Sequence, residues 1–317
     1  MTIFVIRRVA WLIVTAVLLS FVLFFATEAL PGNVAIRILG QAATPQSIAR
    51  LRTQLGLNAS LMSQYLTWAG HLLTGNLGRS LASGRTLTST LGTRVLNSAL
   101  LVGVTSVIAM PLAVVIGMLL AARRGRVGAE VAGATMLGLI SLPQFVIGIL
   151  LILLLSTGLF HVLPAVTTVA PGQSVVHGPT SLVLPVLTLV LASTPYLARL
   201  VAASAAEVLR SEYVVAARFR GVRGWPLLFR HVLPNALVPT VQAMTLTVAY
   251  LAGGIVIVES VFNYPGIGQA FVSAVANRDV PTIQIIALGL ALVYLVLNLI
   301  GDVVSILLTP RLRTAMS

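Results

Sequence analysis

Six apolar stretches, each long enough to cross a membrane, constrain the fold of this chain more than any other feature. A helix needs about 20 consecutive apolar residues to cross the hydrocarbon core of a bilayer, because each residue adds only about 1.5 Å of length. The stretches are Val9–Leu30, Leu96–Ala122, Val131–Phe160, Ser181–Ala203, Leu237–Val258 and Thr282–Leu308. We therefore predict an all-α, polytopic membrane protein with six transmembrane helices.

The composition supports this prediction and excludes several classes of protein. Hydrophobic residues make up 58% of the 317 residues and charged residues only 9%, compared with about 25% charged residues in soluble domains. The net charge of +13 is dispersed over helix ends, which indicates membrane orientation and not nucleic acid binding. All basic residues are Arg, so the Lys of a phosphate-binding GxxxxGK[ST] loop is missing and another polypeptide must bind any ATP.

The distribution of Arg predicts the orientation in the membrane. Most Arg residues in short loops fall on one side, and Arg278 is the one strong exception on the other. Short loops rich in Arg are cytoplasmic, so we expect both termini in the cytoplasm. The first apolar stretch follows Arg7 and Arg8 and exceeds the 7–15 residues typical of a signal peptide, which favours a retained anchor over a cleaved signal.

A long segment, residues 31–95, separates the first two stretches and is predicted to be an external helical insert. One amphipathic helix starts at Thr44-Pro45 and stops at Gly56. A second repeats apolar residues at helical spacing, at Leu61, Tyr65, Trp68 and Leu72. We expect the two helices to pack together or to lie along the membrane interface, and leave open whether they contact substrate or form a self-packed cap.

A basic hairpin, residues 205–235, joins the fourth and fifth stretches. Its first helical run ends at Gly221, which tolerates the left-handed conformation found after a helix end. Pro226 suits the first turn of a second short helix. Most runs of charge are no more than a solvated surface, but the ordered spacing within this hairpin favours a surface for another protein.

The spacing of Ala216-Ala217, Gly221 and Leu233-Pro234 resembles the EAA loop of ABC-importer permeases, although Val215 replaces the Glu of the motif and His231 replaces a commoner aliphatic residue. Similarity to the dipeptide/oligopeptide branch of this family covers nearly the whole chain and is weakest at Arg94–Leu101. The motifs that carry it are Glu212-Tyr213-Val214, Gln54-Leu55-Gly56-Leu57, Gly75-Asn76-Leu77-Gly78-Arg79-Ser80, Glu259-Ser260-Val261-Phe262, Pro265-Gly266-Ile267-Gly268 and Pro310-Arg311-Leu312-Arg313.

This resemblance implies a permease subunit of an ATP-driven importer of dipeptides or short oligopeptides in a bacterial-type plasma (inner) membrane. It implies four kinds of partner: a second, homologous permease chain, two ATP-binding chains that carry ATP and Mg, an extracytoplasmic substrate-binding protein, and the peptide. Residues 1–30 would be the N-terminus and first span, 96–310 a five-helix permease core and 311–317 a cytoplasmic tail.

The resemblance also assigns roles to particular residues. Those expected to couple the chain to the ATPase are Glu212, Tyr213, Ala216, Ala217, Arg220, Gly221, Arg223, Leu233 and Pro234. Those expected at the outer mouth of the pathway are Glu259, Phe262, Pro265, Gly266 and Gly268, followed by a short outer helix at Gln269–Asn277.

The chain offers no cluster of catalytic groups and no metal-ligand spacing. It has no Cys, and none of His71, His161, His177 and His231 is paired as in H-E-x-x-H. We therefore predict no enzyme activity, no catalytic or metal site and no cofactor in this chain. Among its carboxylates only Asp302 falls within a predicted span, and an inter-helix brace with Arg199 is favoured over a proton relay because a relay needs several such acids.

Two kinds of alternative remain open. The same architecture would serve the import of nickel chelates, glutathione or haem, since the binding protein largely sets the specificity of such systems. A secondary transporter driven by an ion gradient predicts inverted repeats and several charges at the membrane midplane, and the sequence shows neither.

Overall fold

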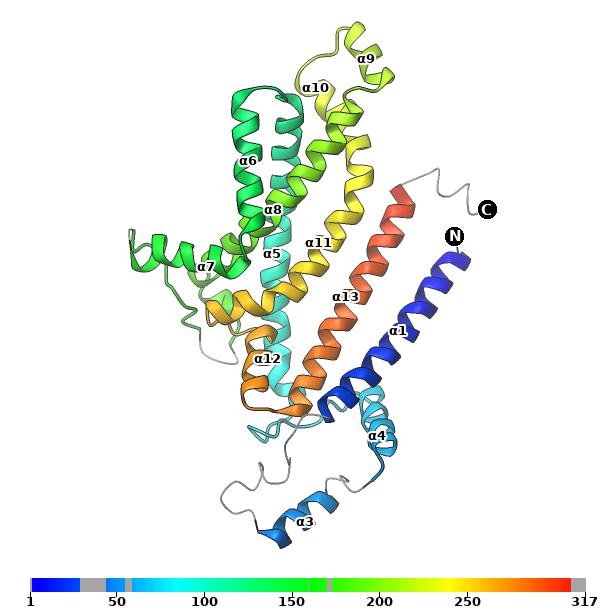
Figure 1. Ribbon diagram of the computed structural model, residues 1–317, viewed down its shortest axis with the longest axis vertical. Helices are drawn as coiled ribbons and strands as arrows, with labels where there is room; N and C mark the ends of the chain where they lie inside the picture. The colour runs from blue at the N-terminus through cyan, green and yellow to red at the C-terminus, as the bar shows by residue number, and fades with distance from the viewer. Residues whose placement is uncertain (1, 29–43, 55–58, 159, 170–172, 309–317) are drawn as a thin grey trace.

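The computed structural model describes residues 2–28, 44–54, 59–158, 160–169 and 173–308 (Figure 1). The predicted tail, the Pro310 motif and the helix stop at Gly56 lie outside the described residues. Within the described ranges the chain is almost entirely helical, and its extended pairing is one isolated bridge between Arg79 and Thr86. The predicted all-α class is confirmed.

The described part of the chain has a body of five long helices: α1 (Thr2–Glu28), α5 (Leu87–Ala122), α8 (Thr180–Val208), α11 (Leu233–Val261) and α13 (Val280–Leu308). Each is long and apolar enough to cross a membrane. In Figure 1 they run along the long axis of the molecule, with α1 beside α13 at one edge. We call the end that carries residues 205–235 the hairpin end and the opposite end the insert end.

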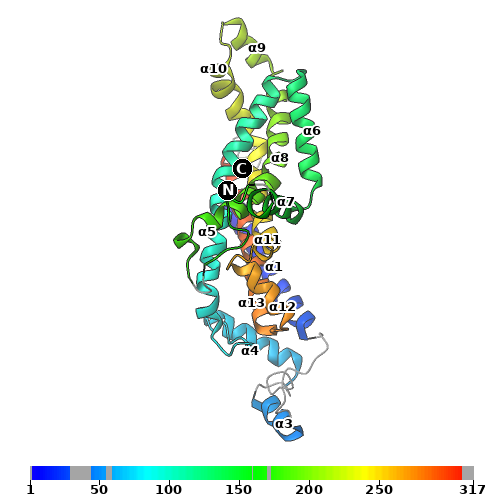
Figure 2. The same ribbon diagram turned by 90° about the vertical axis from the view of Figure 1, so that its left-hand side faces the viewer.

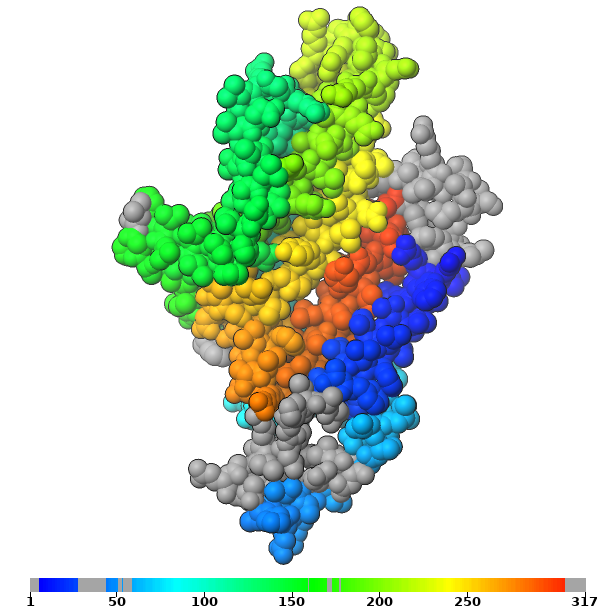
Figure 3. Space-filling model, in the orientation of Figure 1, coloured from blue at the N-terminus to red at the C-terminus, as the bar shows by residue number. Residues whose placement is uncertain are grey.

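The predicted third span, Val131–Phe160, is not one straight helix. It divides into α6 (Val127–Ser141) and α7 (Gln144–Ile152), with a π-helical turn at Leu153–Thr157, and the two parts are bent by 102°. Leu142 is extended with ψ 131°, as expected before a proline, and Pro143 lacks the N–H that would continue the helix. Figure 2 shows α7 end-on, and in Figure 3 it projects from one side of the body.

Small residues allow α5 and α8 to pack closely along their length. Ala113, Ala198 and Ala205 are fully buried between them. A Cβ at Gly117 would lie only 2.6 Å from the carbonyl oxygen of Ala198, so this crossing needs glycine. The two helices connect an apolar cluster near the insert end with a second cluster near the hairpin end.

The insert contains α3 (Pro45–Gln54), which starts where Thr44-Pro45 predicted, and α4 (Leu61–Leu73). The aromatic face of α4 packs against α1. Tyr65 and Trp68 contact Phe24 with ring centroids 5.6 and 5.5 Å apart, and the Tyr65 hydroxyl is 3.0 Å from Ser20 Oγ. The helical spacing of the aromatics predicted a packed face but not its partner.

A buried carboxylate fastens the insert to the body. Asp279, which directly precedes α13, accepts hydrogen bonds from Ser80 Oγ (2.5 Å), the Leu81 N–H (3.0 Å) and Thr282 Oγ1 (2.6 Å). The turn that brings Ser80 to Asp279 has Gly78 at φ +82°, a conformation that favours glycine. The Gly75–Ser80 motif therefore positions a hydroxyl for the start of α13.

Candidate functional site

The hairpin folds as two short helices that meet at Gly221. The first, α9 (Glu212–Phe219), ends in a Schellman motif: the Gly221 N–H donates to Arg218 O (2.9 Å) and the Val222 N–H to Ala217 O (3.1 Å). Gly221 has φ +86°, which confirms the predicted stop. Pro226 lies in the first turn of α10 (Trp225–Leu227), as predicted, and a π-helical turn at Leu228–Val232 leads into α11.

One face of α9 is seated on the ends of the long helices. Val214 and Ala217, one helical turn apart, are 0% and 1% exposed and pack in a cluster with Met118 of α5 and Val201 of α8. Ala217 was expected among the residues that couple the chain to the ATPase. It is instead buried within its own chain, because the helix uses the i, i+3 face for attachment.

Most of the other predicted coupling residues lie on the surface, and one packs against the bundle. Glu212, Tyr213, Ala216, Arg220, Gly221, Arg223 and Pro234 are exposed, whereas Leu233 is partly buried against the same cluster as Ala217. The Tyr213 hydroxyl donates to His231 O at 3.2 Å, which ties the start of α9 to the far arm of the hairpin. The exposed residues thus present a surface at one extremity of the molecule (Figure 1).

Aromatic residues that the motif did not single out complete this surface. Phe219 is 88% exposed at the end of α9, and the half-exposed rings of Trp225 and Phe229 stack with centroids 5.5 Å apart. Exposed aromatic side chains beside Arg are typical of protein interfaces. The sequence signal was available, since Phe219 stands directly between Arg218 and Arg220.

At the insert end, Glu259 holds the segment that follows α11. Its carboxylate accepts hydrogen bonds from Ser98 Oγ (2.5 Å), the Gly268 N–H (2.6 Å) and the Gln269 N–H (3.2 Å). The last two donors belong to the first turn of α12 (Ile267–Ala276), where free N–H groups favour a negative charge. The short helix predicted at Gln269–Asn277 thus exists and begins two residues earlier.

The glycines of the Pro265-Gly266-Ile267-Gly268 motif are required by close approach. A Cβ on Gly266 would overlap the Glu259 carboxylate, and one on Gly268 would overlap the backbone of Val256. Phe262 is also buried and packs beside Gly148 of α7. All five residues predicted at the pathway mouth are therefore buried within this chain and hold the segment in shape. That the segment lines the pathway stays a prediction.

Polar residues of α5, in the region where the family resemblance is weakest, support the same segment. Asn97 Nδ2 donates to Pro265 O (3.0 Å), and Arg94 Nη1 donates to Gln269 Oε1 (2.7 Å). The Tyr264 hydroxyl donates to Asn97 O (2.7 Å), and burial, together with the nearby Glu259 charge, raises the pKa of Tyr264. The tyrosine therefore stays a donor. The missed signal was Arg94 followed one turn later by Asn97 and Ser98 in an otherwise apolar helix.

Asp302 pairs with an arginine other than the predicted one. Its Oδ2 lies 2.9 Å from Arg8 Nη1, so the pair joins α13 to α1. Arg199 is exposed on α8, and among the described residues no ion pair links it to Asp302. The reason is which helices are neighbours: α13 packs on α1 and α11, whereas α8 packs on α5 and α11.

Comparison with known proteins now identifies this architecture. Residues 113–314 match the family model described as binding-protein-dependent transport system inner membrane component, and residues 1–116 match the N-terminal model of the same membrane components. The chain belongs to this family. It is a multi-pass permease subunit of an ABC importer in the inner membrane, and such permeases work with ATPase subunits and a substrate-binding protein.

Relatives match this permease over almost their full length. A probable peptide ABC transporter permease protein, y4tP of Sinorhizobium fredii, is 33% identical over 99% of the chain and 100% of the relative. The metal-staphylopine import system permease protein CntB of Staphylococcus aureus is 31% identical, and the glutathione transport system permease protein GsiC of Salmonella typhi 34% identical, each over 98% of both chains.

Proposed function

We propose that this permease carries dipeptides or short oligopeptides across the membrane in an ATP-driven importer. The similarity to y4tP, named as a peptide permease, over the whole length of both chains is the observation that carries this proposal. ATP and Mg bind to the partner ATPase subunits, and this chain itself needs no cofactor. A second, homologous permease chain forms a heterodimer with it, and both termini face the cytoplasm.

A second cargo is favoured by the other relatives. The names of GsiC and CntB indicate glutathione and a metal chelate. Glutathione is a tripeptide, so its backbone groups are those that a permease for short peptides also meets. Nickel chelates belong to the same alternative through the metal-chelate relative, whereas no relative described above favours haem.

The hairpin is the proposed point of coupling to the ATPase. Val214 and Ala217 seat α9 on α5 and α8, so a displacement of α9 moves the ends of both helices. The exposed face, with Ala216, Phe219 and Arg220, is left for the ATPase. ATP then shifts the permease toward one conformation only if the ATPase dimer binds the hairpin more tightly in that conformation.

Uptake by whole cells tests the cargo. Cells that lack this chain are complemented with it and supplied with a labelled dipeptide, labelled glutathione or a labelled metal chelate. We expect complementation to restore energy-dependent dipeptide uptake, and an excess of unlabelled peptide to compete with it. Restored uptake of glutathione or the chelate without dipeptide uptake contradicts the proposed cargo and supports the alternative.

A further inference from the structure

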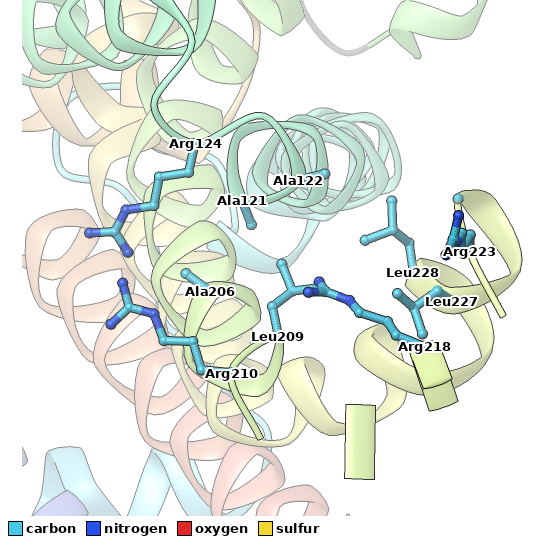
Figure 4. A pocket seen from close by; sticks show the side chains of 11 residues that line it. Ala121, Ala122, Arg124, Ala206, Leu209, Arg210, Arg218, Arg223, Leu227 and Leu228 are labelled. Atoms are coloured by element: carbon cyan, nitrogen blue, oxygen red, sulfur yellow. The ribbon is translucent and has the colours of Figure 1, made fainter. Parts of the chain in front are cut away.

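A cavity lined by four arginines lies between the hairpin and the ends of the long helices. Its volume is about 610 Å³. Figure 4 shows Arg124, which follows α5, and Arg210, which follows α8, pointing toward one another, while Arg218 of α9 reaches back from the hairpin. Arg223 completes the set on the hairpin side.

The positive charge of this cavity has no counter-charge within the described chain. Among the described residues that line the cavity there is no carboxylate. The three acidic residues nearest in sequence, Glu130, Glu207 and Glu212, are exposed, and in the described ranges none forms an ion pair with these arginines. Four guanidinium groups around one space repel each other, and an anion between them removes that repulsion.

The position of the cavity along the helices indicates where such an anion comes from. Arg124 and Arg210 each lie two residues beyond the end of a membrane-crossing helix, after Ala122 and Val208. This is the depth of the lipid head groups. The remaining wall is mostly apolar, with Ala121, Leu209 and Leu227, and the aromatic pair Trp225 and Phe229 lies on the adjoining arm.

The geometry points to a binding site for the phosphate of an anionic phospholipid, with phosphatidylglycerol as the simplest such lipid. Guanidinium groups bind phosphate through paired N–H donors, and basic pockets at the cytoplasmic ends of membrane helices bind anionic head groups. Free phosphate shares this chemistry but makes no use of the apolar wall. A docked ATPase would meet the exposed face of α9, whereas this cavity lies between α9 and the ends of α5 and α8.

A lipid at this place would join the hairpin to the bundle. Its phosphate would contact Arg218 on one side and Arg124 and Arg210 on the other. It would therefore join α9 to the ends of α5 and α8, as Val214 and Ala217 do by direct packing. The inference adds a lipid requirement to the proposed coupling. It does not depend on which cargo is carried, so lipid binding and peptide uptake are tested separately.

Native mass spectrometry of the full-length chain tests the site, with phosphatidylglycerol and phosphatidylcholine as probes. We expect the double variant R124Q/R210Q to bind phosphatidylglycerol about 25-fold more weakly, at about fivefold per arginine, with no change for phosphatidylcholine. The matched control R123Q/R126Q removes the same charge from the same loop region outside the cavity and should change binding less than twofold. R218Q alone, on the hairpin, should weaken binding about fivefold.

Four results would overturn the inference. One is unchanged phosphatidylglycerol binding in both R124Q/R210Q and R218Q, and another is an equal loss in the control R123Q/R126Q. The third is displacement of the lipid by millimolar inorganic phosphate, which would assign the cavity to a free anion. If R124Q/R210Q instead releases the ATPase subunits from the purified complex while lipid binding is unchanged, the arginines serve the protein interface.

Discussion

Gly266 shows how a single missing side chain decides the structure at the insert end. The Glu259 carboxylate occupies the space where a Cβ would be, because it must reach the N–H groups of Gly268 and Gln269. We expect Gly266→Ala to displace the carboxylate and to lower the free energy of unfolding by about 1–3 kcal/mol or more, measured by thermal or denaturant unfolding in detergent.

The control for this change is Gly253→Ala in α11, where an added Cβ meets no described atom within 4 Å apart from the neighbouring backbone of its own helix. In a helix interior, alanine is favoured over glycine by about 0.5–1 kcal/mol, so the control should be neutral or slightly stabilising. Equal destabilisation by the two substitutions would contradict the role given to Gly266.

Residue-level predictions from the sequence succeeded where local backbone chemistry decides the outcome. Gly221 after a helix and Pro226 at a helix start are such cases, because each depends on its own φ angle. The partner of Asp302 could not be predicted in this way. It depends on which helices are neighbours, and α13 lies beside α1, which carries Arg8.

At the scale of elements, α9 has one face buried against the bundle and one face exposed. Its buried face holds it to the bundle, so changes on its exposed face should spare the fold. We expect Phe219→Ala, which removes an 88% exposed ring, to leave the amount of the permease in the membrane unchanged but to weaken binding of the ATPase subunits about 5- to 30-fold. Co-purification of the ATPase at graded salt measures this.

Val127→Ala is the matched control, since Val127 is 81% exposed at the same end of the molecule but lies on α6. It should retain the ATPase subunits in full. If Phe219→Ala also retains them and uptake is normal, the exposed face of α9 is not the docking surface.

The break between α6 and α7 is the element that the sequence did not reveal. Residues 131–160 are uniformly apolar, and a proline within such a run often only kinks a membrane helix. The change of direction depends on tertiary contacts as well. Gln144 lies against Gly254 of α11 and Gly148 against Phe262, so α7 crosses α11 instead of continuing α6.

For the whole molecule, the order of the apolar helices and five of the six predicted spans were predictable, but the neighbours of each helix were not. Lipid and helix surfaces are equally apolar, so hydropathy does not choose between packing partners. The choice follows from small residues such as Gly117 and from buried hydrogen bonds such as Gln284 Nε2 to Thr27 Oγ1 (2.7 Å), which joins α13 to α1.

The orientation of the whole molecule can be tested by labelling single introduced cysteines, because the chain contains no Cys of its own that would react. The insert and the hairpin lie at opposite ends, and the arginine-rich loops are expected in the cytoplasm. Ala82→Cys places a thiol on an exposed turn at the insert end, and Val127→Cys places one at the hairpin end. In intact cells a membrane-impermeant maleimide should label the first and not the second, and after permeabilisation it should label both. The reverse pattern would put the hairpin outside, where no cytoplasmic ATPase reaches it, and would remove the basis for coupling through α9.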